Sequence, residues 1–191
     1  MKGLVGQLGA LAFLLVVAVA RDSHADVRLP IALQAQLARR LGSFDRNFAA
    51  RVGATAKVLV VRKAGDAESK RIASAFSSSL GALKDIAGVP LVIEELDFID
   101  AASLASRCRS QKVSVLYFSV GLEGDMGSVA TAFAGIDVLT IGALPAHAEK
   151  GAVVGFDLEE GHPKLVVNLA RAKAQNVSFK AELLKLARIV E

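Results

Sequence analysis

The stretch with the most capacity for chemistry is "GLEGDMGS", residues 121–128, which combines three glycines, two carboxylates and a serine. It lies where an apolar run gives way to helical spacing, and such a corner is where α/β proteins bind ligands. Glycines let a ligand approach the backbone, but the carboxylates would repel phosphate. A flexible edge loop is the favoured interpretation, and a small-ligand site is the alternative. The candidate ligand-binding residues are Gly121, Glu123, Gly124, Asp125, Gly127 and Ser128.

A second strand-to-helix corner, "KAGDAESK" at residues 63–70, has a single glycine, Gly65, beside two acids. It matches neither the dinucleotide fingerprint nor the phosphate-binding loop. We expect a plain turn in which Asp66 caps the following helix.

No arrangement typical of an enzyme occurs in the sequence. There is no Gly-x-Ser-x-Gly elbow, and no acid, base and nucleophile can be assigned to one another. His147 and His162 adjoin turn residues and are expected to be solvated loop residues, with no short-spaced zinc motif. The acids Glu94, Glu95 and Asp97 lie along one strand, and sequence shows neither the cleft nor the separation that a catalytic pair needs. We therefore expect no catalytic activity, cofactor or metal.

Residues 1–25 are predicted to be a signal peptide, because Lys2 precedes an apolar run too short to span a bilayer. Small residues at Ser23 and Ala25 favour cleavage after Ala25. Cleavage after Ala20 and an uncleaved anchor are the alternatives. Residues 26–191 then form one domain, exported to the periplasm and not inserted in the membrane after cleavage.

The charge balance is weak: 23 basic and 19 acidic side chains give a formal net charge of +4. Aromatic residues are scarce and tryptophan is absent, so the charged groove with stacking rings of a nucleic-acid binder is not expected. The single cysteine, Cys108, is predicted to be a buried small apolar residue, or else a thiol that pairs between chains.

The apolar periodicity predicts alternating helices and strands. A stripe from Leu33 to Val52 predicts one helix, with Gln34, Arg39, Arg40, Asp45 and Arg46 on its solvated side. Strands are expected at 57–63, 90–98, 113–120 and 137–144, separated by helices over 66–83, 100–111 and 124–136. This order predicts an α/β fold, a single three-layer domain with a mixed, mostly parallel sheet.

The pattern changes after Pro145. Two strand-like runs on either side of "EEGHP" predict a C-terminal β-hairpin, because strands close in sequence pair antiparallel. A closing amphipathic helix from Phe179 is expected next, with Leu183, Leu186 and Val190 on its apolar stripe and Ser178 as its cap. Its charge is low for a membrane-surface helix, so it is expected to seal the core.

The segment from Gly151 to Ile189 resembles the closing part of the YfiR-like family of bacterial periplasmic proteins. The resemblance rests on a glycine-led strand, a short turn, a strand ending in Asn168 and Leu169, and a final "LLKLA". It implies an often dimeric periplasmic protein that binds the external domain of an inner-membrane signalling protein, a diguanylate cyclase, and inhibits it. A periplasmic small-ligand-binding module is the alternative function.

Overall fold

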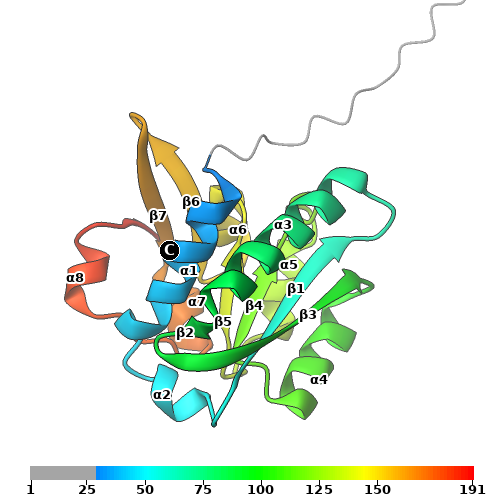
Figure 1. Ribbon diagram of the computed structural model, residues 1–191, viewed down its shortest axis with the longest axis horizontal. Coiled ribbons are helices and arrows are strands. Elements are labelled where there is room, and N and C mark those ends of the chain that lie inside the picture. Colours follow the sequence, from blue (N-terminus) through cyan, green and yellow to red (C-terminus); the bar gives the residue numbers. More distant parts are fainter. Residues whose placement is uncertain (1–28) are drawn as a thin grey trace, which may run out of the picture.

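An eight-stranded sheet passes through the centre of the computed structural model, which describes residues 29–191 (Figure 1). The predicted signal peptide lies outside the described residues. The strand order is β2-β3-β1-β4-β5-β6-β7-β8. Strands β3, β1, β4, β5 and β6 are parallel, β2 and β7 run antiparallel to their neighbours β3 and β6, and β8 is parallel to β7. The strands are β1 (Ala56–Lys63), β2 (Asp85–Ile86), β3 (Val89–Phe98), β4 (Val115–Phe118), β5 (Leu139–Gly142), β6 (Val154–Glu159), β7 (His162–Asn168) and β8 (Arg188–Val190).

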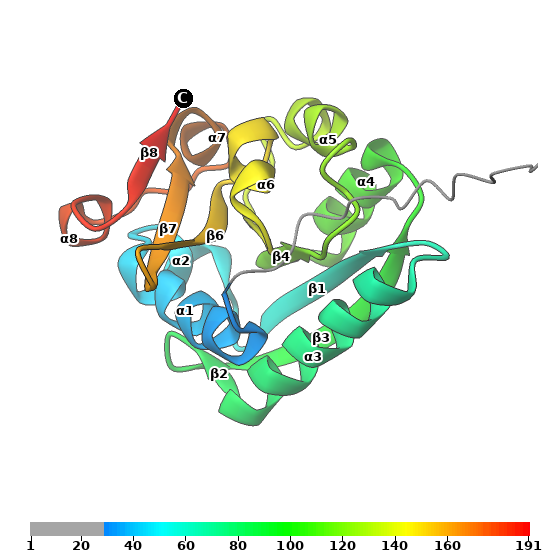
Figure 2. The ribbon, with the colours of Figure 1, turned by 90° about the horizontal axis from the view of Figure 1, so that it is seen from above.

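Helices cover both faces of this sheet (Figure 2). The helices are α1 (Ile31–Phe44), α2 (Phe48–Arg51), α3 (Ala67–Leu83), α4 (Ala101–Gln111), α5 (Met126–Ala132), α6 (Pro145–Lys150), α7 (Leu169–Ala174) and α8 (Ala181–Leu184). Helices α1 and α3 lie on one face, while α4 to α7 lie on the other. The predicted mixed, mostly parallel three-layer α/β fold is thereby confirmed.

Strand β1 shows why the sequence folds this way. Val58 and Val60 point into the core under α1 and α3, while Leu59 and Val61 point into the second core under α4 and α5. Because both faces are buried, the strand needs a continuous apolar run rather than an alternating one. The helix that follows begins as predicted, since the Asp66 carboxylate accepts a hydrogen bond from the Ser69 amide at 2.8 Å.

The first predicted helix is interrupted, and part of its solvated side is buried. Helix α1 ends at Phe44, because Asp45 is extended and forms a β-bridge with Phe179. Gln34 is buried, where its amide donates to the carbonyls of Leu29 and Ala143 and accepts from the Tyr117 hydroxyl at 2.9 Å. The predicted solvent exposure of Gln34 and Asp45 was therefore wrong. Both polar groups are buried because partners distant in sequence satisfy them.

The predicted hairpin is confirmed by β6 and β7, but the closing amphipathic helix was wrong. Only Ala181–Leu184 is α-helical, and the chain then extends as β8 beside β7. The backbone at Ser178 and Lys180 bonds to Arg46 and Phe44, which holds this stretch extended and prevents a helix from starting at Phe179. Phe179 and Leu183 still cover the core, because both are buried. Leu186 does not, since it is 72% exposed.

Cys108 lies on the buried side of α4 and is 2% exposed, so the predicted burial is confirmed. Burial raises the pKa of its thiol to about 12. Because the thiolate is the reactive form, we expect native protein at pH 8 to resist iodoacetamide and to run as a monomer in non-reducing electrophoresis. Alkylation should become complete in urea. Rapid labelling of the native protein, detected by mass spectrometry, would contradict this assignment.

Candidate functional site

The carboxyl ends of β1 and β4 form the point at which the sheet's connections reverse direction. From β1 the chain crosses through α3 to β3, and from β3 it crosses back through α4 to β4 on the other side of β1. Ligands of open α/β sheets bind outside such a switch point. The predicted corner lies there: Gly121, Glu123, Gly124 and Asp125 follow β4, and Gly127 and Ser128 begin α5.

Hydrogen bonds of the protein itself close much of this corner. The Ser69 hydroxyl donates to the Val120 carbonyl at 2.7 Å, and the Ser119 hydroxyl donates to the Ser69 carbonyl at 2.8 Å. The Lys63 ammonium contacts the Asp125 carboxylate at 3.1 Å. The end of β1 and the start of α3 are thus joined to the segment after β4. The outer backbone is still accessible, because an added Cβ at Gly124 or Gly127 would have nothing within 4 Å.

His147 lies against the same corner and was predicted wrongly as a solvated loop residue. It is fully buried in α6 and packs on Gly142 so closely that a Cβ there would lie 2.1 Å from the His147 Cβ. Its Nδ1 accepts from the Leu144 amide at 3.2 Å, so Nε2 carries the proton. That Nε2 has no hydrogen-bond partner among residues 29–191 and lies 3.6 Å from the Glu123 Oε1. The Glu123 carboxylate in turn accepts from the Gly121 amide at 3.1 Å.

This arrangement suits a donor to a ligand or water oxygen better than a metal ligand, because a neutral histidine binds metal through a nitrogen that carries no proton. Among residues 29–191, no three His, Cys, Asp or Glu side chains gather closely enough to hold a metal ion. His162, the other predicted loop histidine, is exposed at the start of β7. Sequence reasoning missed His147, Lys63 and Ser69 at this corner. A single polar residue amid apolar ones, as in "LPAHA", was the one available signal for His147.

Burial lowers the pKa of His147 to about 3, from an ordinary value of 6.5, with a smaller contribution from Lys150. Between these values the unfolded chain binds a proton that the folded chain does not. The free energy of unfolding should therefore fall as pH drops below about 6.5, by up to about 1.4 kcal/mol per pH unit. Urea titrations from pH 7 to 4.5 should show a flatter dependence for His147→Gln, with His162→Gln as the matched control. Parallel curves for the protein and His147→Gln would refute the assignment.

At the β8 end of the sheet, an apolar groove of about 230 Å³ opens between α1, β7 and the α8 segment. Leu186 of its lining is 72% exposed, and Arg40 is the charged residue of that lining. The residues that line it are Leu37, Arg40, Leu41, Phe44, Pro163, Leu165, Leu183 and Leu186. The lining is apolar apart from Arg40.

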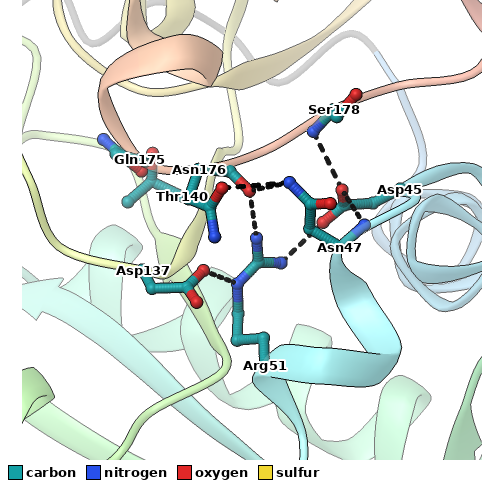
Figure 3. Close-up of polar contacts among 8 residues, drawn as sticks. All are labelled: Asp45, Asn47, Arg51, Asp137, Thr140, Gln175, Asn176 and Ser178. Atoms are coloured by element: carbon teal, nitrogen blue, oxygen red, sulfur yellow. Dashed lines mark hydrogen bonds and ion pairs between the residues drawn. The ribbon is translucent and has the colours of Figure 1, made fainter.

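A polar cluster surrounds Arg51 at the amino-terminal ends of the strands, whereas the glycine-rich corner lies at their carboxyl ends (Figure 3). The Arg51 guanidinium contacts the carboxylates of Asp45 and Asp137, both at 2.6 Å, and donates to the Asn176 carbonyl at 3.0 Å. Its side chain is 2% exposed and that of Asp45 is fully buried. These charges satisfy one another and join α2 to the segment after α7, which is a structural role.

The mostly parallel sheet, its switch point and the helices on both faces define a doubly wound α/β domain. The chain belongs to the YfiR/HmsC-like family, whose profile matches residues 32–188, and the resemblance drawn from the sequence is confirmed. Membership is consistent with a periplasmic regulator. In the described part of the chain, no helix is long and apolar enough to cross a membrane. A search of curated proteins found no sequence relative.

Two solved structures share the fold. One is the ABC domain in complex with L-Trp from Streptococcus pneumonia, with a TM-score of 0.61, 12% identity, and coverage of 84% of this chain and 62% of that one. The other is a conserved domain protein from Vibrio cholerae O1 biovar El Tor strain N16961, with a TM-score of 0.55, 16% identity, and coverage of 85% and 60%. The chain thus spans about three fifths of the length of each.

Proposed function

We propose that this protein is a non-catalytic periplasmic regulator that binds the external domain of an inner-membrane signalling protein, a diguanylate cyclase, and inhibits it. Family membership supports the regulatory class. The observation that carries the proposal is the apolar groove between α1, β7 and α8, which leaves Leu186 72% exposed. Exposed apolar surface rimmed by polar residues is typical of a protein interaction site.

The groove lies beside the short edge strand β8, where Ile189 is also exposed. A partner that packs on Leu186 would bury it together with Phe44 and Leu165 of the groove walls. Arg40 at the rim would contact an acidic residue of the partner. Binding would then act on the cyclase from the periplasmic side, with no reaction on the part of the regulator.

The test is deletion of the gene, followed by measurement of cyclic-di-GMP and complementation with variants. Deletion should raise the nucleotide level, and the native gene should restore it. Leu186→Asp should fail to restore it while remaining folded, and Leu169→Asp, at a partly exposed site on α7, is the matched control. Pull-down with periplasmic receptor domains identifies the partner. Unchanged cyclic-di-GMP together with no membrane partner would refute the cyclase proposal.

The second candidate is a periplasmic small-ligand-binding module, and the specific observation that favours it is the unpartnered His147 Nε2 beside Glu123 and Gly121. A ligand oxygen at this corner would accept from that nitrogen. A thermal-shift screen of metabolites should then give a saturable rise in Tm. Gly124→Trp should abolish the rise without unfolding, because the space at Gly124 is open. No saturating metabolite, or a rise that Gly124→Trp leaves intact, would remove this corner as the site.

The homodimer that the family resemblance implies remains a prediction. Light scattering after size exclusion measures it, and the concentration dependence of the mass shows whether the subunits associate reversibly.

A further inference from the structure

The outer edge of β3 is a long strand edge without a neighbour in the described part of the chain. On its inner side, Leu91–Phe98 pair with β1 in continuous parallel register. On its outer side, β2 pairs only with Val89 and Pro90. Eight residues therefore present an unpaired edge of roughly 25 Å, which can be followed along β3 in Figure 1. Natural proteins keep exposed edges short unless another strand covers them.

Apolar side chains gather along and beyond this edge. Val92 is 59% exposed, and Ile99, directly after the strand, is 85% exposed. A groove of about 300 Å³ lies at the same end of β3, between the strand and α4. Its lining includes Leu96, Phe98 and Leu104. The end of the edge thus offers a place for an apolar side chain as well as free backbone groups.

The two faces of β3 differ in charge. Glu95 and Asp97 point to the α3 face, where the first bonds to Ser74 and both contact Arg62, at 3.1 and 2.6 Å. Leu96 and Phe98 point to the α4 face and pack in its core. Over residues 95–98, a binding strand would therefore meet carboxylates on the α3 face and apolar groups on the α4 face.

Acidic groups outnumber basic ones here. Glu94, which pairs with Arg107, adds to Glu95 and Asp97, so three carboxylates share two guanidinium groups. Asp100, at the groove, is a fourth carboxylate and caps α4. The surplus negative charge favours a basic partner.

A second copy of the chain suits this edge poorly. A closed two-fold dimer would pair β3 with itself in antiparallel fashion. Registers centred on residues 94, 95 or 96 place Glu94 opposite its own copy, Glu95 opposite its own copy, or Asp97 opposite Glu95. Like charges directly opposite one another destabilise a strand pair. The acids therefore act against self-association and leave the edge to a chain of complementary charge.

We propose that the outer edge of β3 binds an extended segment of another protein by strand addition. That segment carries lysine or arginine at alternate positions, opposite Glu95 and Asp97. Its intervening residues are apolar, and one of them enters the groove beside Phe98 and Ile99. Backbone hydrogen bonds supply affinity and the alternation supplies specificity, as in other cases of β-augmentation. This surface is separate from the groove at α1 and does not depend on the cyclase proposal.

The probe is an eight-residue peptide of alternating lysine and valine, labelled for fluorescence anisotropy against the full chain. We expect saturable binding that weakens at least tenfold when the same residues are arranged as a block of lysines and a block of valines. Methylation of alternate backbone amides, on the register that pairs with β3, should abolish it. Equal binding of the alternating, block and methylated peptides would overturn strand addition.

Variants locate the site. Asp97→Lys should weaken binding of the alternating peptide at least tenfold, because the Asp97 side chain is 52% exposed and available to the peptide. The replacement leaves Arg62 paired with Glu95. Glu182→Lys is the matched charge reversal on α8 and should change little. Equal weakening of peptide binding by both variants would show that only long-range electrostatic attraction acts, and would overturn the proposal. The peptide should protect amides of Leu91–Phe98 from hydrogen exchange, and protection elsewhere would place the site elsewhere.

A further measurement distinguishes the β3 edge from the apolar groove at α1. Leu186→Asp should bind the alternating peptide as the native protein does, because Leu186 lies at the β8 end of the sheet. If light scattering shows a dimer that Asp97→Lys dissociates, the edge is an interface between copies and the proposal fails. If the peptide does not bind, the cyclase proposal is unaffected.

Discussion

Replacing Arg51 with alanine is expected to lower the free energy of unfolding by about 3–5 kcal/mol. The guanidinium lies between the carboxylates of Asp45 and Asp137, and its side chain is 2% exposed. Its removal leaves the fully buried Asp45 carboxylate with backbone donors from Asn47 and Ser178 but no cation. An uncompensated buried charge costs far more than the loss of a surface ion pair.

The consequence should extend beyond one ion pair, because Arg51 joins three parts of the chain. Its partners come from the end of α1, from the loop before β5 and from the segment after α7, where it reaches the Asn176 carbonyl. That segment holds Phe179 against Asp45. Loss of Arg51 should therefore loosen the C-terminal part of the chain before the rest.

Urea unfolding monitored by circular dichroism measures the change, and hydrogen exchange shows where it begins. Arg71→Ala is the matched control: that side chain is 65% exposed and pairs with Glu68 one turn away. Its effect on the free energy of unfolding should be far smaller, because exposed ion pairs contribute little. Equal effects of the two replacements would show that the Arg51 cluster contributes no more than a surface pair.

The elements that sequence predicted well are those whose pattern depends on local packing. Residues 58–61 of "KVLVVRK" are buried on both faces, and a short continuous apolar run rich in β-branched residues is typical of such a strand. Alternation of such runs with helical stripes is enough to predict a mostly parallel sheet. The order of the strands, with β8 beside β7 and β2 at the far edge, depends on contacts that the pattern does not contain.

Buried polar residues are the ones that sequence placed wrongly. Gln34, Asp45 and His147 looked solvated because a polar side chain belongs in water unless a partner satisfies it. The Gln34 partner at Ala143 is 109 residues away, and the Asp45 partner at Ser178 is 133 residues away. No local pattern encodes such pairs.

The predicted ligand corner also combines a feature that the sequence indicated with one that it did not contain. The glycine-rich corner lies at the switch point after β4, where the space at Gly124 is open, and its binding of a ligand stays a prediction. Glycine spacing could not show that Lys63 at the end of β1 and Ser69 at the start of α3 bind across the corner. Backbone freedom is a property of the segment, whereas closure of a site is a property of its neighbours in space.

Leu183→Asp is expected to unfold the domain, with a loss of at least about 4 kcal/mol from lost apolar burial and a carboxylate placed in the core. Leu183 is 5% exposed and lies against Leu41 and Phe44 of α1 and Leu165 of β7. Leu186→Asp, three residues further on, changes a side chain that is 72% exposed and should cost little. The pair of variants has identical chemistry and differs only in burial.

The pair also separates two roles that a regular amphipathic helix would have merged. In such a helix both leucines would share one buried stripe, and both replacements would unfold the protein. Because the chain leaves α8 after Leu184 and extends as β8, Leu183 faces the core while Leu186 faces solvent. Circular dichroism should show a folded Leu186→Asp protein and an unfolded Leu183→Asp protein. A folded Leu183→Asp protein would mean that the C-terminal segment detaches while the core stays folded. Leu183 would then not be needed to hold α1 against the sheet.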